Sequence, residues 1–532
     1  MNGITVISFL AVIIAIIAVS LLTSKKSKIK NVAGLFFANR KLSFAAVGCA
    51  LFFTNVNAAE FLGGSEAAYI NNMTTMAWGV SSVFAMVIVS EFIMPVYLRG
   101  GINTTPDFLK TRFDNGTKML VSAIFLIGYM VNLLPIILYT GAVALNGMFR
   151  ISDVFHCSYF GGIVIMVIFM GIAGGTYSVL GGLKIIAVSD ILLGVCLFAG
   201  GVFLTYFGLR YIGHGDWSSG WHQLLTTHKE HLNSIGSATD AVPFSGIFTG
   251  MLLVNLFYWG TEQVIVQQAL SAKNLEMSQK GIALTCCGKL AGPFLFMLPG
   301  IIAVHAFEHM PQTIQVFPKL VRDLTPPAIC GFIAAIVFGA AITSFSKALN
   351  SSGTLFILNI YKPYLIKRRK NFNDSVLLLA SRKFEIIAAL IAILLAPMII
   401  FANSNFYTYI QKANATFSIP IFTVMFVGFL TKKVPPIAAK CGIVFCATGY
   451  LLTQFVFHTG INFLHILALL FIATTILMLV IGKFAPMKPV KRPVKVMNSY
   501  LTPWRGRHWV NALLIAVMIA LFVLFSKAGL AG

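Results

Sequence analysis

The sequence predicts an all-α polytopic membrane protein with about 14 transmembrane helices. Of its 532 residues, 58% are hydrophobic and only 10% are charged, whereas about a quarter of the residues in soluble domains carry a charge. A spanning helix needs about 20 apolar residues, so this number of helices leaves little chain for a separate soluble domain. The composition therefore excludes a soluble globular fold.

The positions of the apolar stretches justify each expected helix. Several stretches are longer than a straight crossing requires, which allows a tilt or an interruption. The expected segments are 4–23, 42–70, 75–98, 119–149, 159–181, 185–212, 244–268, 281–307, 327–360, 384–403, 404–430, 435–457, 461–482 and 509–528.

The distribution of positive charge predicts the orientation. The chain has 39 Lys and Arg against 16 Asp and Glu, and most of the basic residues fall in alternate connections, including the run 367–370. Such an excess is typical of cytoplasmic loops, so both termini are expected to be external. The protein is expected to lie in a cell (inner) membrane. The basic runs are not interleaved with stacking aromatics, so the charge does not indicate a nucleic-acid partner.

Three features near the ends and in the loops have simple interpretations. The segment 4–23 follows no positive residue and precedes a basic run, so we expect it to remain as a helix and not to be a cleaved signal peptide. Seven of the eight Cys lie in apolar stretches without metal-binding spacing and are expected to be small packing residues. The long external connection contains irregularly spaced histidines, which are expected to be solvated and not metal-binding; they are His214, His222, His228 and His231.

Charged residues inside apolar segments are costly and are therefore candidates for function. Three of the acids, Glu66, Glu91 and Glu262, are expected to lie near an interface where water is available. Four other charged residues have no obvious access to water and are the stronger candidates for function: Glu60, Asp190, Lys289 and Lys347.

Two segments read poorly as continuous helices. Residues 52–64 combine Asn, Glu and paired Gly at mid-membrane, and residues 255–263 repeat this pattern five helices later. An unwound stretch is tolerated at that depth only where it lines a cavity, and paired interruptions in two halves indicate a transporter site built by an inverted repeat. The expected repeats are 42–212 and 244–430.

The remaining parts of the chain are expected to lie outside this core. They are an extra N-terminal helix with its loop (1–41), an external loop (213–243) and three peripheral helices (431–532). The ninth segment offers Ala340, Thr343 and Ser344 on one helical face. Hydroxyl and carbonyl oxygens suit a weakly held monovalent cation, although the same hydroxyls could instead bond their own helix or join two helices.

At this point the sequence resembles the sodium:solute symporter family, and within it the sodium/glucose and sodium/galactose cotransporter branch. The resemblance runs from about Ala45 to Lys433. The stretches that carry it are 48–63, 181–190, 255–289, 298–301, 349–352 and 409–411. It implies a core of ten helices in two inverted five-helix repeats, with broken first and sixth core helices, and solute uptake coupled to sodium entry.

The resemblance also implies roles for individual residues. The family's sugar-site positions match Asn255, Tyr258, Lys289 and Gln411; together with Asn55 and Glu60 of the broken segment they form the expected solute site. Its sodium ligands match the carbonyls of Phe53 and Val56 and the groups of Ala340, Thr343 and Ser344. Asp190 matches an acid on the inward sodium route, and Lys347 is expected to contact it, which predicts one sodium per solute.

Two departures concern the solute. Glu60 stands where the family has a glutamine or histidine, and Ala77 stands where it has a sugar-binding glutamate. We expect sodium-coupled import of a neutral hexose-like sugar. The alternatives are another solute, such as a polyol or inositol, or proton coupling through Glu60. The chain lacks a nucleotide loop, a metal cluster and an appended catalytic domain, so no enzyme is expected. Sodium is the expected co-transported ion, and membrane lipid surrounds the protein.

Overall fold

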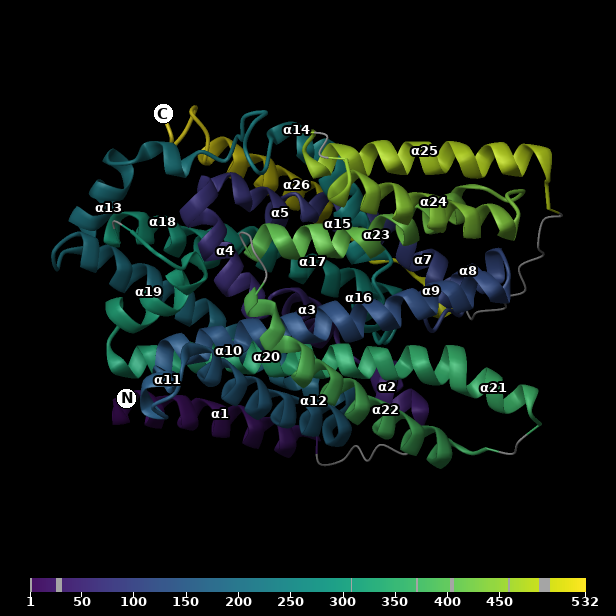
Figure 1. Cartoon of the computed structure of the whole chain (residues 1–532), viewed down its shortest axis with the longest axis horizontal. Helices are drawn as coiled ribbons and strands as arrows, with labels where there is room; N and C mark the ends of the chain where they lie inside the picture. Colours follow the sequence, from purple (N-terminus) through teal and green to yellow (C-terminus); the bar gives the residue numbers. More distant parts are fainter. Residues whose placement is uncertain are drawn as a thin grey trace.

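The computed structural model describes residues 2–24, 31–307, 309–369, 372–401, 406–457, 460–487 and 498–532. The basic residues at 25–30, at 370 and in 488–497 lie outside these ranges. Within the described ranges all long elements are helices, and most of them run along the longest axis of the molecule (Figure 1).

The α-helices are α1 (Gly3–Ser24), α2 (Val32–Phe37), α3 (Phe44–Asn55), α4 (Ala58–Asn71), α5 (Met76–Val80), α6 (Ser82–Ile88), α7 (Met94–Arg99), α8 (Thr105–Arg112), α9 (Asn115–Gly128), α10 (Leu134–Phe149), α11 (Ile151–Val154), α12 (Tyr159–Ile212), α13 (Trp217–Thr226), α14 (Phe244–Gly246), α15 (Leu252–Gly260), α16 (Gln263–Leu270), α17 (Leu275–Gly292), α18 (Leu298–Ala306), α19 (Val316–Leu324), α20 (Pro327–Leu355), α21 (Lys362–Lys367), α22 (Asp374–Leu395), α23 (Phe406–Leu430), α24 (Pro436–Phe455), α25 (Phe463–Phe484) and α26 (Arg507–Leu524). Short 3₁₀ and π turns join or interrupt them, including η2 (Asn72–Thr75) and η5 (Lys229–Leu232).

Twelve helical stretches in the described part of the chain are long and apolar enough to cross a membrane. They correspond to all but two of the predicted segments. The exceptions, 42–70 and 244–268, hold shorter apolar helices, Phe44–Asn55 and Phe244–Gly260. The predicted count of about 14 is therefore corrected to about 12 continuous spans, because polar residues and glycines divide these two segments. The protein is an integral membrane protein.

Two of the predicted segments form one continuous helical element, α12, which contains a sharp reversal. Gly182 lies in it at φ 59° and ψ 175°, a backbone conformation open mainly to glycine. The hydroxyls of Tyr177 and Ser189 lie in hydrogen-bond contact across this reversal. A straight helix would hold residues 12 positions apart at about 18 Å. The expected cytoplasmic connection near Lys184 is therefore only a tight turn.

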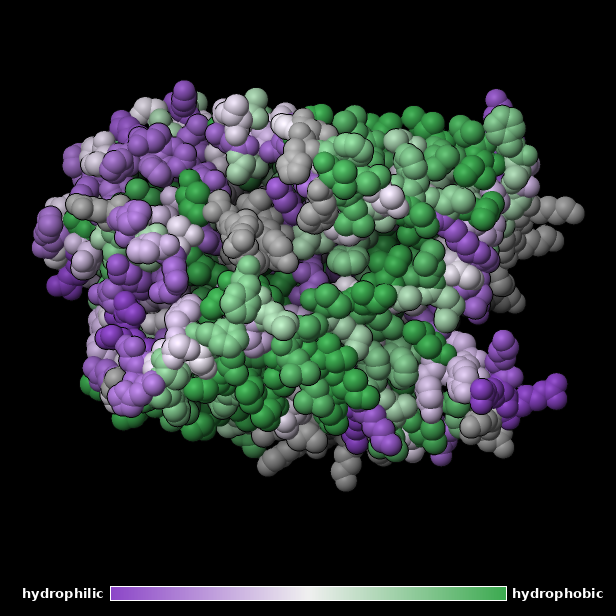
Figure 2. Space-filling model, viewed as in Figure 1, coloured by the Kyte–Doolittle hydropathy of each residue, from purple (hydrophilic) through white to green (hydrophobic). Residues whose placement is uncertain are grey.

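The two ends of the molecule differ. Both termini, α13 and α19 lie at one end, while α8 and α21 lie at the other (Figure 1). Hydrophobic residues dominate the middle of the visible face, and hydrophilic residues gather most densely at the end that carries α13 and α19 (Figure 2). The termini and α13 of the loop 213–243 therefore lie at the same end of the molecule, as the alternation of loop charges predicts.

Close packing of α3 against α17 brings residues of the two helices together near the centre of the molecule. A Cβ atom at Gly48 would lie 2.9 Å from the backbone oxygen of Gly281, and one at Gly281 would lie 2.7 Å from a methyl carbon of Val47. The hydroxyl of Thr285 also donates to the Gly48 carbonyl at 3.0 Å. Small residues permit this approach, so Lys289, one turn further along α17, lies directly beside the end of α3.

Candidate functional site

The predicted interruption of the second segment is present between α3 and α4. Val56 takes a non-helical conformation (φ −83°, ψ 85°), and Asn57 caps the helix that follows, since its side-chain oxygen accepts from the Ala59 N–H at 2.8 Å. Asn favours such caps over helix interiors. The break leaves backbone carbonyls near the middle of the molecule free of the usual helical bonds.

The seventh segment is also interrupted, between α15 and α16. Thr261 and Glu262 fall outside both helices. The Tyr129 hydroxyl donates to a carboxylate oxygen of Glu262 and accepts from the Val264 N–H at 3.2 Å. A side-chain pair therefore closes this break, and the carboxylate faces the interior of the molecule.

A cavity of about 190 Å³ lies between the two interruptions. This volume is below that of typical drug-sized ligand pockets, so the cavity suits a small solute. All six residues expected from the sequence to contact the solute line it: Asn55, Glu60, Asn255, Tyr258, Lys289 and Gln411.

Lys289 forms the central polar contacts of the cavity. Its Nζ donates to Asn55 Oδ1 at 2.6 Å and lies 3.2 Å from Glu60 Oε1. Both partners of the Lys289–Glu60 pair are largely shielded, with side-chain exposures of 6% and 13%. A Cβ atom at Gly79 would lie only 3.6 Å from this ammonium. The three side chains come from α3, α4 and α17 and form one charge-paired group.

The other cavity residues connect to different helices. Asn255 donates to the Ser81 hydroxyl at 3.3 Å, and the Tyr258 hydroxyl lies 3.5 Å from the Thr54 carbonyl. Asn132 donates to Asn414 at 2.6 Å on the cavity wall. Amides and one phenol thus point at a volume whose remaining lining is mainly apolar.

The five groups expected to hold sodium are buried beside the break in α3. Phe53, Val56 and Ala340 have no exposed surface, and Thr343 and Ser344 have 2% and 1%. The Ser344 hydroxyl donates to the Phe53 carbonyl, and the Thr343 hydroxyl donates weakly to the Ala340 carbonyl at 3.4 Å. Neutral hard oxygens from α3 and α20 therefore meet here, which is a donor set suited to a monovalent cation.

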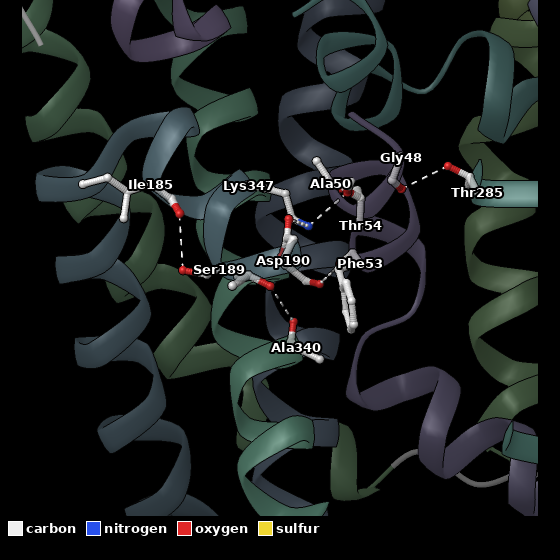
Figure 3. A network of polar contacts seen from close by, with 12 residues as sticks. Gly48, Ala50, Phe53, Thr54, Ile185, Ser189, Asp190, Thr285, Ala340 and Lys347 are labelled. Carbon is white, nitrogen blue, oxygen red and sulfur yellow. Dashed lines mark hydrogen bonds and ion pairs between the residues drawn. The ribbon is translucent and has the colours of Figure 1, made fainter. Parts of the chain in front are cut away.

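The predicted contact between Lys347 and Asp190 is confirmed. Lys347 Nζ lies 3.0 Å from Asp190 Oδ2 and 3.1 Å from the Ala50 carbonyl (Figure 3). Both side chains are fully buried. A charge at this depth is tolerated because it has a partner of opposite sign. The ammonium stands one turn along α20 from Ser344.

The expected position at an aqueous interface is wrong for Glu262 and Glu66. Glu262 lines the cavity and bonds Tyr129. Glu66 is only 2% exposed and accepts a 2.6 Å hydrogen bond from the Thr313 hydroxyl. Glu91 is partly buried and pairs with Arg507 at 2.9 Å. For Glu262 the signal was available, because the acid directly follows the Gly260–Thr261 interruption.

A further buried acid is not among the candidates that the sequence indicates. Glu385 on α22 is 1% exposed and accepts hydrogen bonds from Ser178 at 2.7 Å and Ser381 at 2.9 Å. Its nearest charged neighbour in the sequence, Lys383, belongs to a predicted cytoplasmic loop, which makes the acid look like part of the helix end. Both hydroxyls satisfy the carboxylate, so it joins α22 to α12.

Comparisons with known proteins agree with this geometry. The family model for the sodium:solute symporter family matches residues 35–445. The uncharacterized symporter YidK of Escherichia coli is 34% identical, and the match covers 99% of this chain and 92% of that protein. A sodium/glucose cotransporter of Vibrio parahaemolyticus is 29% identical, with 84% of each chain covered.

The fold is that of a solved transporter. The substrate-bound, outward-open structure of a Na⁺-coupled sialic acid symporter superimposes with a TM-score of 0.77 at 18% identity, covering 92% of this chain and 100% of that one. Such identity shows the fold alone. The family consists of transporters, so the chain is not an enzyme. With a family match over most of its length, the chain is a sodium-coupled solute symporter and belongs to the sodium:solute symporter family.

Proposed function

We propose that this symporter imports a neutral hexose-like sugar. The observation that carries the proposal is the Lys289–Asn55–Glu60 group, which places a cationic donor and an anionic acceptor side by side in a small cavity. Sugar hydroxyls are both donors and acceptors, and a paired set of this kind can bind them without a net charge. A relative named for glucose, at 29% identity, supports the same class of solute.

The remaining cavity residues complete the proposed solute site. Asn255 and Gln411 offer amide donors and acceptors, and Tyr258 offers a flat face for a sugar ring. Buried hydroxyls that lack partners are costly, so such a site selects solutes with many hydroxyls. Carboxylate solutes fit poorly because Glu60 would repel them.

Sodium binding at Phe53, Val56, Ala340, Thr343 and Ser344 is proposed to hold the broken helix in the shape that binds solute. Sodium then favours the outward-open state, and its loss to the cytoplasm releases both ligands, as population linkage requires. One charge crossing 100 mV contributes ~2.3 kcal/mol, which corresponds to roughly a fortyfold solute gradient.

The Asp190–Lys347 pair is proposed to set the stoichiometry at one sodium per solute. The tethered ammonium fills the space beside the carboxylate, so a second cation there would meet a like charge at close range. In water-poor surroundings that repulsion is strong. Asp190 and Lys347 then act as a coupling element along the ion route and hold no second ion.

We further propose the arrangement of the chain in the membrane. The core consists of the repeats 42–212 and 244–430, flanked by 1–41, the loop 213–243 and the peripheral helices 431–532. Both termini and α13 share one end of the molecule (Figure 1), and the distribution of loop charges supports an external position for this end. The bacterial relative supports a location in the cell (inner) membrane.

A panel of labelled solutes tests the proposal. Purified protein is reconstituted in proteoliposomes, and uptake of hexoses, polyols, inositol and carboxylates is measured with sodium or choline outside. Hexose uptake that requires sodium is expected. Preferential uptake of inositol or of another polyol would replace the hexose assignment, and uptake that persists in choline and follows a pH gradient would assign coupling to protons at Glu60.

A further inference from the structure

A group of metal-ligand side chains lies outside the solute cavity, after α13. His228, Glu230 and His231 each offer one ligand atom, and the three atoms lie within 4.8 Å of one another. His228 Nδ1 is 3.3 Å from Glu230 Oε1. The spacing in sequence gives no metal motif, and the short helix η5 produces the cluster by turning the three side chains toward one point.

The local backbone holds this arrangement. His228 takes a left-handed conformation at φ 54°, which is uncommon for residues other than glycine. Leu232 is 1% exposed, and the Ser234 N–H donates to the Phe525 carbonyl at 2.5 Å. Lys229 Nζ also donates to the backbone oxygen of Gly532 at 2.9 Å. The turn is therefore anchored to the C-terminal segment and not free in solvent.

One side chain of the cluster carries a buried nitrogen without a partner. His231 Nδ1 is buried, and no hydrogen-bond partner for it exists among the residues that the structure describes. Buried polar atoms are nearly always satisfied by protein, water or an ion. This nitrogen belongs to one of the three clustered side chains, and a metal ion bound through it would satisfy it. The expectation that all four loop histidines are merely solvated does not account for it.

A fourth imidazole connects the cluster to the transport core. The His305 ring at the end of α18 lies 5.5 Å from the His228 ring, measured between centroids, and its Nε2 is 3.0 Å from the Thr227 carbonyl. The helix α18 packs against α4, and η5 packs against η2, the turn that follows α4. A metal on this cluster would therefore link the external loop to the outer half of the broken helix.

We propose that His228, Glu230 and His231 form an external site for a divalent transition metal of the zinc class. Two imidazoles and one carboxylate are a donor set that zinc accepts, with the fourth position left to water. Bound metal stabilises the contact between the loop 213–243 and the outer end of α4. The site is separate from the sodium and solute sites and does not depend on the identity of the solute.

Zinc binding to the purified full-length protein in lipid nanodiscs tests the site. Zn²⁺ is titrated against a competing chromogenic chelator, and one saturable site per chain is expected. His231→Gln and Glu230→Gln should each weaken binding at least tenfold. His228→Asn should do the same, and it keeps a residue that tolerates the left-handed conformation. His214→Gln and His222→Gln are matched controls from the same loop and should stay within twofold of wild type.

A second measurement separates lost binding from lost folding. Zn²⁺ should raise the melting temperature of the wild-type protein and of both controls, whereas the three ligand variants should melt cooperatively without a zinc-dependent increase. Absence of saturable zinc binding in the wild type would overturn the proposal. So would equal affinity in the wild type and in His231→Gln, with binding abolished instead by substitution of the exposed cysteines Cys287 and Cys441.

Discussion

Removing one member of the Asp190–Lys347 pair should destabilise the protein far more than removing both. The two groups are 3.0 Å apart, and neither has exposed surface. Loss of one partner leaves a buried charge uncompensated, which costs about 3–5 kcal/mol, whereas replacing a whole buried pair is often close to neutral. We therefore expect about 3–5 kcal/mol of destabilisation for Asp190→Asn and for Lys347→Met, and a much smaller loss for the double variant.

A double-mutant cycle measures this coupling. The free energy of unfolding of the four proteins is determined in mixed micelles by reversible denaturation, and the coupling energy is the deviation of the double variant from the sum of the singles. Arg150 and Asp153 serve as the matched control, since they are 2.6 Å apart but 65% and 60% exposed. Their coupling should stay below about 1 kcal/mol. A coupling below about 0.5 kcal/mol for Asp190 and Lys347 would refute the reasoning.

The remaining predictions concern transport. Lys289→Ala should abolish measurable uptake while the protein stays folded, because a lost charged hydrogen bond costs about 1.5–3 kcal/mol; normal uptake in proteoliposomes would remove Lys289 from the solute site. Glu60→Gln should change solute affinity or preference and retain sodium dependence, as measured by competition between solutes; simultaneous loss of pH dependence and of coupling would instead favour proton transport. Reversal potentials measured at several sodium gradients should give one sodium per solute, and a value of two would contradict the role proposed for Lys347.

Composition was sufficient to predict the interruptions of the two broken segments. Asn57 becomes a helix cap and the Gly260–Thr261 step ends a helix, as their low helix propensities suggest. The partners of the shielded polar groups around these breaks do not follow from the sequence. Glu60 contacts Lys289, which lies 229 positions away in the sequence, and no local sequence pattern predicts a contact between residues so far apart. Their pairing follows from the close approach of α3 and α17, which two glycines allow.

The burial of the acids Glu66 and Glu262 is a second feature that the sequence does not predict. Glu66 and Glu262 lie near the ends of the apolar stretches 42–70 and 244–268, and this position in the sequence predicts access to water. That prediction fails when a helix is short or broken, because the ends of the half-helices lie inside the molecule. It also fails when another element covers the helix end, as the Thr313 turn covers Glu66. Tertiary contacts therefore decide burial at these positions.

The hydrogen bond from Ser344 to the Phe53 carbonyl gives the proposed sodium site a competitor within the protein. An arriving ion must displace that hydroxyl from the carbonyl before both oxygens can coordinate it. A typical hydrogen bond is worth about 0.5–1.5 kcal/mol net, so the exchange lowers sodium affinity by roughly two- to tenfold. The same bond keeps α3 and α20 joined when the ion departs, so the empty carrier retains the shape it needs to return and load again.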